Sequence, residues 1–241
     1  MKKLRLVSAL FVIVVCFASE QAFGQSEWTG NVNVLYGVKN INDDWTVAGS
    51  DLGYGGDDFT LEVSGTSEFG INADFGKTNW PVNILIGIYM ADGDDSWSGS
   101  DVRAIYVDDS FYDATFAVQT KLKAETREIR IGAKRSFTVG KLPKFSPYVA
   151  CGLVLAEAEA KVSYSVAMEA PEIDLSDSNG GSDSVDDSAM GFWLGGGVSF
   201  QVFRQFTVGA EISYSSAEVD LRGVDIESGG IHYGMFVGYH W

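Results

Sequence analysis

The chain ends with the stretch Ile231-His232-Tyr233-Gly234-Met235-Phe236-Val237-Gly238-Tyr239-His240-Trp241. Every odd-numbered position is large and apolar or aromatic, whereas the even positions hold two His, two Gly and one Phe. Because successive side chains of a strand point to opposite faces, the stretch has one apolar face and one mostly small or polar face. Its length suits a tilted strand that crosses a bilayer, with aromatic residues near both ends of the apolar face.

The amino terminus has the organisation of a secretory signal peptide. Positive residues at positions 2, 3 and 5 precede a short apolar run at 6–17 and a small-x-small site at 22–24. We therefore predict that residues 1–24 are removed and that residues 25–241 form a single domain. Cleavage would leave Cys151 as the only cysteine, so the mature chain has no internal disulfide.

Composition narrows the class of protein. The formal net charge is −16, and loss of the basic signal peptide makes it more negative, which excludes a nucleic-acid binder. A hydrophobic content of 46% with 21% charged residues is not that of a disordered chain. The 28 Gly and only 4 Pro suit closely packed strands better than helices.

Alternation with a period of two recurs along the chain, which is typical of a membrane barrel. We predict eight strands, near residues 27–39, 68–76, 82–90, 121–134, 148–162, 190–200, 206–214 and 231–241. The lipid-facing residues of this pattern include Val34, Ile86, Ile131, Leu194, Val208 and Val237. The predicted inward-facing charges are Glu68, Asp74, Glu128, Arg130, Lys134 and Glu211. For 148–162 the pattern does not decide which face points inward.

The connections alternate in length and charge. Residues 77–81, 137–147 and 201–205 are short, whereas 40–67, 91–120, 167–189 and 215–230 are long and acidic. Short turns on the periplasmic side and long extracellular loops are typical of transmembrane barrels, and an even strand number returns both termini to the periplasm. Residues 101–120 could instead form an additional hairpin, which would give ten strands.

These features together resemble the small outer-membrane β-barrels, the group that contains the OmpA transmembrane domain, OmpX and OmpW. The resemblance covers essentially the whole mature chain and implies an all-β, transmembrane, antiparallel up-and-down barrel in the bacterial outer membrane. It also implies contact with outer-membrane lipid and lipopolysaccharide, and a monomer without cofactors. In such proteins the last strand is the recognition signal for the barrel-assembly machinery. The corresponding residues here are Tyr233, Met235, Val237, Tyr239 and Trp241.

The inward charges allow two interpretations. An eight-stranded barrel is only wide enough for its side chains to fill it, and buried charges must be paired. The charges therefore favour an ion-paired plug that makes the barrel rigid. The alternative is a narrow polar passage.

The two histidines and the acidic loops provide no strong site. His232 lies close in sequence to Glu227 and Ser228, but the His-x-Ser motif of lipid A deacylases is absent because Gly234 stands two residues after His232. We interpret His232 as a polar interior residue and His240 as structural. The pairs Asp94-Asp95, Asp108-Asp109 and Asp186-Asp187 lack the spacing of a calcium-binding loop, so we predict no metal site.

Three functions remain. The favoured one is a structural or surface-interaction barrel, followed by an OmpW-like channel for small or hydrophobic solutes and then by a lipid A-modifying enzyme. A filled lumen would separate the first from the second. A Ser–His–acid cluster at the outer rim would favour the third. A secreted β-sandwich is a minor alternative.

Overall fold

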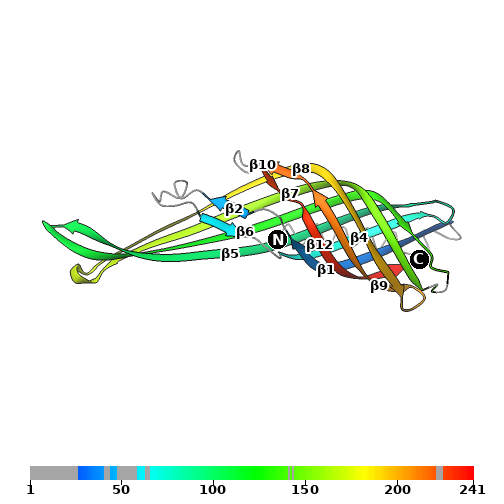
Figure 1. The fold of residues 1–241 in the computed structure, drawn as a ribbon, viewed down its shortest axis with the longest axis horizontal. Helices are drawn as coiled ribbons and strands as arrows, with labels where there is room; N and C mark the ends of the chain where they lie inside the picture. The colour runs from blue at the N-terminus through cyan, green and yellow to red at the C-terminus, as the bar shows by residue number, and fades with distance from the viewer. Residues whose placement is uncertain are drawn as a thin grey trace.

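The computed structural model describes residues 27–40, 44–47, 59–62, 66–140, 142, 144–220 and 225–241, so the predicted signal peptide lies outside the described residues. Eight antiparallel strands close into a barrel (Figure 1). Around the ring they are β1 (Trp28–Asn40), β12 (Gly230–His240), β9 (Phe206–Ser216), β8 (Leu175–Gln201), β7 (Phe145–Ala170), β6 (Ser110–Ser136), β5 (Asn83–Val107) and β4 (Thr66–Lys77), which pairs again with β1. The prediction of eight strands is confirmed.

Side chains alternate across the barrel wall as the sequence pattern predicts. The six residues predicted to face lipid are between 39% and 58% exposed, whereas Glu128, Arg130 and Asp74 are almost completely buried. The face of β7 that the sequence left undecided is also resolved, because Val149 and Leu153 point outward and Tyr148 points inward. No helix in the described part of the chain is long and apolar enough to cross a membrane.

The short connections lie at the end of the barrel that also carries the chain's carboxyl terminus. The backbone N–H of His240 donates to the carbonyl of Gln205, in the turn between β8 and β9. The N–H of Thr78, in the turn between β4 and β5, donates to Glu27 next to the start of β1. The predicted separation of short turns from long connections is therefore confirmed.

Two of the long connections are strands and not loops, which corrects the prediction for 91–120 and 167–189. β5 and β6 remain paired up to Val107 and Ser110, and β7 and β8 up to Ala170 and Leu175. The β5–β6 hairpin ends in a two-residue turn at Asp108 and Asp109, which both have positive φ, as this type of tight turn requires. Residues 101–120 are thus the outer end of this hairpin and add no strands to the barrel.

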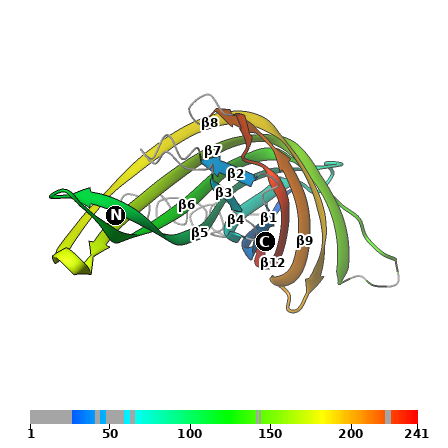
Figure 2. The ribbon, with the colours of Figure 1, turned by 60° about the vertical axis from the view of Figure 1, so that its left-hand side comes forward.

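The four long strands continue beyond the barrel as one sheet, which we call the extended sheet (Figure 2). Its edges are open: β4 stops pairing with β5 at Asp92, and β9 pairs with β8 only from Phe192 onward. In the described part of the chain, 93–107 of β5 and 175–191 of β8 therefore pair with no further barrel strand, and we call them the open edges. β10 approaches the second edge, where the N–H of Asp220 donates to Oδ2 of Asp187. At a rise of about 3.3 Å per residue, β5 alone projects about 50 Å past its last contact with β4.

Shorter elements occupy the other two long connections. β2 (Asp44–Val47) pairs with β3 (Phe59–Glu62), and β10 (Glu218–Asp220) pairs with β11 (Asp225–Glu227). Val219 of β10 packs on the inner face of the extended sheet where that sheet leaves the barrel. It joins a buried cluster with Leu122, Ala124, Ala158 and Ala160. A 3-10 turn, η2 (Pro171–Ile173), links β7 to β8.

The carboxyl-terminal residue helps to close the seam between the first and last strands. The N–H of Trp241 donates to the carbonyl of Gly30, and the N–H of Gly30 donates in return to the Trp241 carbonyl. The indole ring lies where a Cβ at position 30 would be, so the absence of a side chain at Gly30 makes room for the ring.

Deletion of Trp241 is expected to reduce the amount of protein that inserts into the membrane. The change removes the seam contacts to Gly30 and the terminal aromatic residue of the predicted assembly signal. Heat-modifiable gel mobility of membrane fractions measures the inserted form. The matched control is Trp241→Phe, which keeps an aromatic residue and should insert normally. Equal insertion of the deletion variant and the wild type would count against this role.

Candidate functional site

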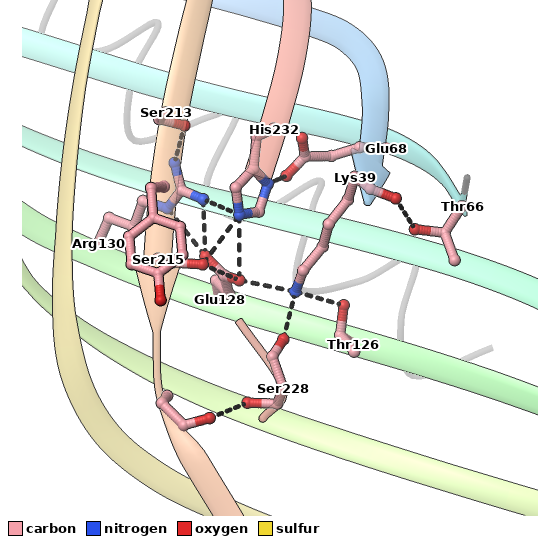
Figure 3. A network of polar contacts seen from close by, with 12 residues as sticks. Lys39, Thr66, Glu68, Thr126, Glu128, Arg130, Ser213, Ser215, Ser228 and His232 are labelled. Carbon is pink, nitrogen blue, oxygen red and sulfur yellow. Dashed lines mark hydrogen bonds and ion pairs between the residues drawn. The ribbon is translucent and has the colours of Figure 1, made fainter. Parts of the chain in front are cut away.

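The inward-facing charges of the barrel gather into two clusters, and we describe them as the outer cluster and the inner cluster. The outer cluster lies toward the extended sheet and consists of Lys39, Glu68, Glu128, Arg130 and His232 (Figure 3). The inner cluster lies nearer the short turns and is built around Asp74 and Lys134. The structure thus divides the six predicted inward charges between two places, with Glu211 beside the inner cluster.

Arg130 lies at the centre of the outer cluster and is fully buried. Its Nε donates to Oε2 of Glu128 at 2.9 Å, and its Nη1 donates to Oγ of Ser213 at 2.9 Å. Its guanidinium carbon lies 4.1 Å from the centre of the Tyr89 ring, so the cation also stacks on an aromatic face. Arg130 therefore connects strands β5, β6 and β9 across the lumen.

Glu128 binds a second cation on its other oxygen. Lys39 Nζ donates to Oε1 of Glu128 at 2.7 Å, to the carbonyl of Ser228 at 2.7 Å and to Oγ1 of Thr126 at 3.1 Å. These three acceptors use all the donors of an ammonium group. A buried charge is costly unless it is paired and hydrogen-bonded, and Lys39 meets both conditions.

The contact between Arg130 and His232 identifies the tautomer of the histidine. Arg130 Nη2 lies 2.8 Å from Nε2 of His232. A guanidinium can only donate, so Nε2 must accept and must carry no proton. The proton of the neutral ring is therefore on Nδ1, which donates to Oε1 of Glu68 at 2.8 Å. With His232 neutral, the two cations Lys39 and Arg130 balance the two carboxylates Glu68 and Glu128.

The inner cluster satisfies its charges in the same way. Lys134 Nζ donates to Oδ2 of Asp74 at 2.7 Å, while Asn83 donates to Oδ1 of the same carboxylate at 2.7 Å. The Lys134 ammonium also lies 4.4 Å from the centre of the Tyr148 ring. The Tyr148 hydroxyl in turn donates a hydrogen bond to Oε2 of half-buried Glu211 at 2.6 Å.

Large side chains fill the lumen between the two clusters. Leu35, Tyr89, Tyr148 and Phe236 form one buried group, and Trp193 belongs to another. The Phe236 ring lies where a Cβ of residue 209 would be, so Gly209 provides the space for it. Among the described residues, the buried side-chain polar atoms without a partner are Thr120 Oγ1 and Trp193 Nε1, and neither belongs to an ion pair.

Ser215, His232 and Glu68 stand in the order of a serine hydrolase relay, which sequence reasoning did not find. Ser215 Oγ lies 2.9 Å from Nε2 of His232, and Nδ1 of the same ring contacts Glu68. Two features oppose catalysis. Arg130 already occupies the Nε2 lone pair that would activate the serine, and Ser215 is fully buried with its hydroxyl 2.9 Å from Glu128.

The neighbours of His232 in sequence do not join it in this relay. Glu227 accepts a hydrogen bond from the Tyr214 hydroxyl at 2.8 Å, and the Ser228 hydroxyl donates to the carbonyl of Ala217 at 2.9 Å. His240 lies at the other end of the barrel, where its Nδ1 is 3.0 Å from the carbonyl of Gly30.

The acidic pairs of the long connections are not arranged as metal sites. Asp94-Asp95 and Asp186-Asp187 lie within strands, where adjacent side chains point to opposite faces. Asp108-Asp109 forms the hairpin turn, and Asp109 accepts a hydrogen bond from Tyr106 at 2.9 Å. Among the described residues, no group of three or more His, Cys, Asp or Glu is placed to hold a metal ion.

The sequence prediction did not include Lys39, Ser213 and Ser215 of the outer cluster and its surroundings, although the alternation pattern places all three side chains inward. Lys39 has the opposite parity to Val34, which is predicted to face lipid, so the alternation pattern predicts that Lys39 points inward. Ser213 and Ser215 likewise continue the inward positions of Glu211. The contact between Lys39 and Glu128 could not be predicted from the sequence, because the two residues are 89 positions apart and their contact depends on how the strands are staggered.

Comparisons with known proteins reveal similarity only in fold. No protein-family model and no curated protein matches the chain. Among solved structures it is similar to Ail of Yersinia pestis, with 13% identity over 88% of this chain and 98% of Ail, at a TM-score of 0.41. The outer membrane protein OprG from Pseudomonas aeruginosa has 6% identity, 88% and 95% coverage and a TM-score of 0.45. Neisserial surface protein A has 10% identity, 89% and 96% coverage and a TM-score of 0.39.

Proposed function

We propose that this chain is an outer-membrane barrel with a structural and surface-interaction role, whose lumen is sealed by side chains at neutral pH. The observation that carries the proposal is the outer cluster, in which Arg130, Glu128 and Lys39 join opposite walls of the barrel. Separating these ion pairs costs free energy on the order of 3–5 kcal/mol, because each ion would be left buried without a partner. The cluster therefore holds the strands of the barrel together and closes the lumen, and it does not line an open passage.

The outer wall supports a location in the bilayer. Val34, Val237 and Val208 occupy directly paired positions on β1, β12 and β9, and each is exposed on the outer surface. Soluble proteins rarely expose such a continuous apolar band, whereas a barrel in lipid requires one. The proposed partners are outer-membrane lipid, lipopolysaccharide and, during biogenesis, the barrel-assembly machinery. We propose that the signal peptide is cleaved and that the mature chain is a monomer.

The extended sheet supports the surface-interaction part of the proposal. Among the described residues, no strand of the barrel pairs with its two edges, and sheet edges of this kind can add a strand from a partner. At its tip, Tyr106 and Phe111 are exposed and their ring centres are 5.0 Å apart. The tight turn at Asp108 and Asp109 fixes the position of these rings.

Conductance decides between this function and the channel alternative. Purified protein in planar lipid bilayers at pH 7.5 is expected to show no stable pore, because the lumen is filled and its charges are paired. Gel mobility before and after heating verifies that the inserted protein is folded. A steady conductance of wild-type protein at neutral pH would contradict the sealed lumen and favour a channel for small solutes.

The enzyme alternative has less support. The Ser215–His232–Glu68 arrangement faces the filled lumen and not the lipid, so an acyl chain in the outer leaflet cannot reach Ser215 without opening the barrel. We therefore propose no lipid-modifying activity and no cofactor.

A further inference from the structure

We propose that His232 is a proton-binding site that opens the sealed lumen in acid. The inference rests on the proposed function, since a lumen must be closed at neutral pH to be opened by a proton. It also rests on geometry: Nε2 of His232 is the acceptor of a hydrogen bond from a permanently charged guanidinium.

A proton added at Nε2 would place two donors against each other. Arg130 Nη2 is 2.8 Å from Nε2, so the hydrogen bond that joins them would be lost on protonation. The new N–H has two acceptors within reach, Ser215 Oγ at 2.9 Å and Glu128 Oε1 at 3.6 Å. Protonated His232 therefore competes with Arg130 for Glu128, the carboxylate that anchors the guanidinium.

The charges around His232 make the added proton significant for the whole cluster. The titratable, charged and polar groups that contact His232 are Glu68 of β4, Glu128 and Arg130 of β6, and Ser215 of β9. Glu128 and Arg130 in turn contact Lys39 of β1, Tyr89 of β5 and Ser213 of β9. Two cations and two carboxylates balance while His232 is neutral. Protonation leaves one excess positive charge in a buried space, which favours release of Arg130 from its partners.

Release of Arg130 would remove the side chain that spans the lumen. Its contacts to Glu128, Ser213 and the Tyr89 ring connect three strands, and all three contacts involve the guanidinium. The Tyr89 ring would also lose the guanidinium that stacks on it, which loosens the aromatic layer that Tyr89 forms with Leu35, Tyr148 and Phe236. Water and small ions could then pass through this layer. Histidine is the side chain whose ordinary pKa makes such a change available between pH 5 and 8.

Planar-bilayer recordings at pH 7.5 and pH 5.0 test the proposal, with the chain's two histidines providing a matched pair of variants. Wild-type protein is expected to be closed at pH 7.5 and to show openings at pH 5.0. Because one proton is bound, the ratio of open to closed molecules should change by at most about tenfold per pH unit. His232→Gln should remain closed at both values, since an amide can accept from Arg130 and donate to Glu68 without titrating. His240→Gln should respond like the wild type.

The protonation state can also be observed directly in the wild type, which avoids dependence on a variant that folds. Nitrogen-15 NMR of histidine-labelled protein in lipid nanodiscs should show His232 as the Nδ1–H tautomer at pH 7.5 and as imidazolium at pH 5.0. A neutral His232 at pH 5.0 would overturn the proposal, as would an equal acid response of His232→Gln. A wild type that is closed at both values would overturn this inference alone. A wild type that conducts at pH 7.5 would overturn the sealed lumen as well.

Discussion

Arg130→Ala is expected to lower the free energy of unfolding by about 3–5 kcal/mol, the usual cost of removing one partner of a buried ion pair. The loss leaves Glu128 with Lys39 as its remaining cation, and Ser213 and His232 without their donor. It also opens a void beside the Tyr89 ring. Equilibrium unfolding in urea from phospholipid vesicles, followed by tryptophan fluorescence, measures the change. Planar-bilayer recordings of the same variant should show a leak.

Arg127→Ala is the matched control for this prediction. Arg127 lies on the same strand and also forms an ion pair, with Glu157 at 2.9 Å, but its side chain faces outward and is partly exposed. Ion pairs of that kind contribute about 0–1 kcal/mol. If the two alanine variants unfold at the same urea concentration, the buried network does not stabilise the barrel as described.

Val237→Arg is expected to impair folding into bilayers severely. Val237 is 58% exposed on the outer wall and is flanked in register by Val34 and Val208. An arginine near the bilayer midplane of a barrel costs about 2–4 kcal/mol, because its charge must leave water or distort the lipid. The fraction of heat-modifiable protein after refolding into vesicles measures the effect.

Ser184→Arg places the same side chain where water should surround it. Ser184 is exposed on β8 in the extended sheet, and its position has the same alternation as the lipid-facing Leu194. This variant should refold like the wild type. Equal refolding yields for Val237→Arg and Ser184→Arg would mean that the outer wall at Val237 does not face lipid.

The barrel could be predicted from the sequence because its spanning segments obey a simple rule. Ile129 and Ile131 alternate with Glu128 and Arg130, and a filled polar interior against a lipid exterior leaves only one way to orient such a strand. The same rule did not decide β7, whose inward side carries Ala150, Val154 and Ala156 while its outward side carries Val149, Leu153 and Leu155. Where both faces are apolar, alternation carries little information.

The β8 part of the extended sheet could not be predicted because its residues are poor strand formers. Residues 175–190 are rich in Asp, Ser and Gly, which are depleted in strands and enriched in loops. Their conformation follows from continued pairing with β7, residue by residue from Phe145 to Ala170. That pairing is a tertiary interaction, and no local pattern records it.

The candidate site was predictable in its composition but not in its connections. The inward positions of Glu68, Glu128 and Arg130 follow from alternation, and the need for each charge to have a partner follows from burial. Which residues become partners depends on the stagger between strands that are distant in sequence. His232 shows this most clearly. Its partners Glu68 and Arg130 are 164 and 102 positions away in the sequence, whereas the nearby Glu227 and Ser228 have other partners.

The open edges of the extended sheet have a consequence for molecules that share a crowded membrane. Two copies that meet side by side could in principle fuse their sheets, edge against edge. The β5 edge carries Asp94, Asp95 and Asp101, and the β8 edge carries Asp177, Asp183, Asp186 and Asp187. Fusion of two copies brings acidic side chains close to acidic side chains, and like charges on two edge strands discourage their pairing. The acidic edges therefore oppose fusion of the extended sheets of neighbouring copies as the protein accumulates.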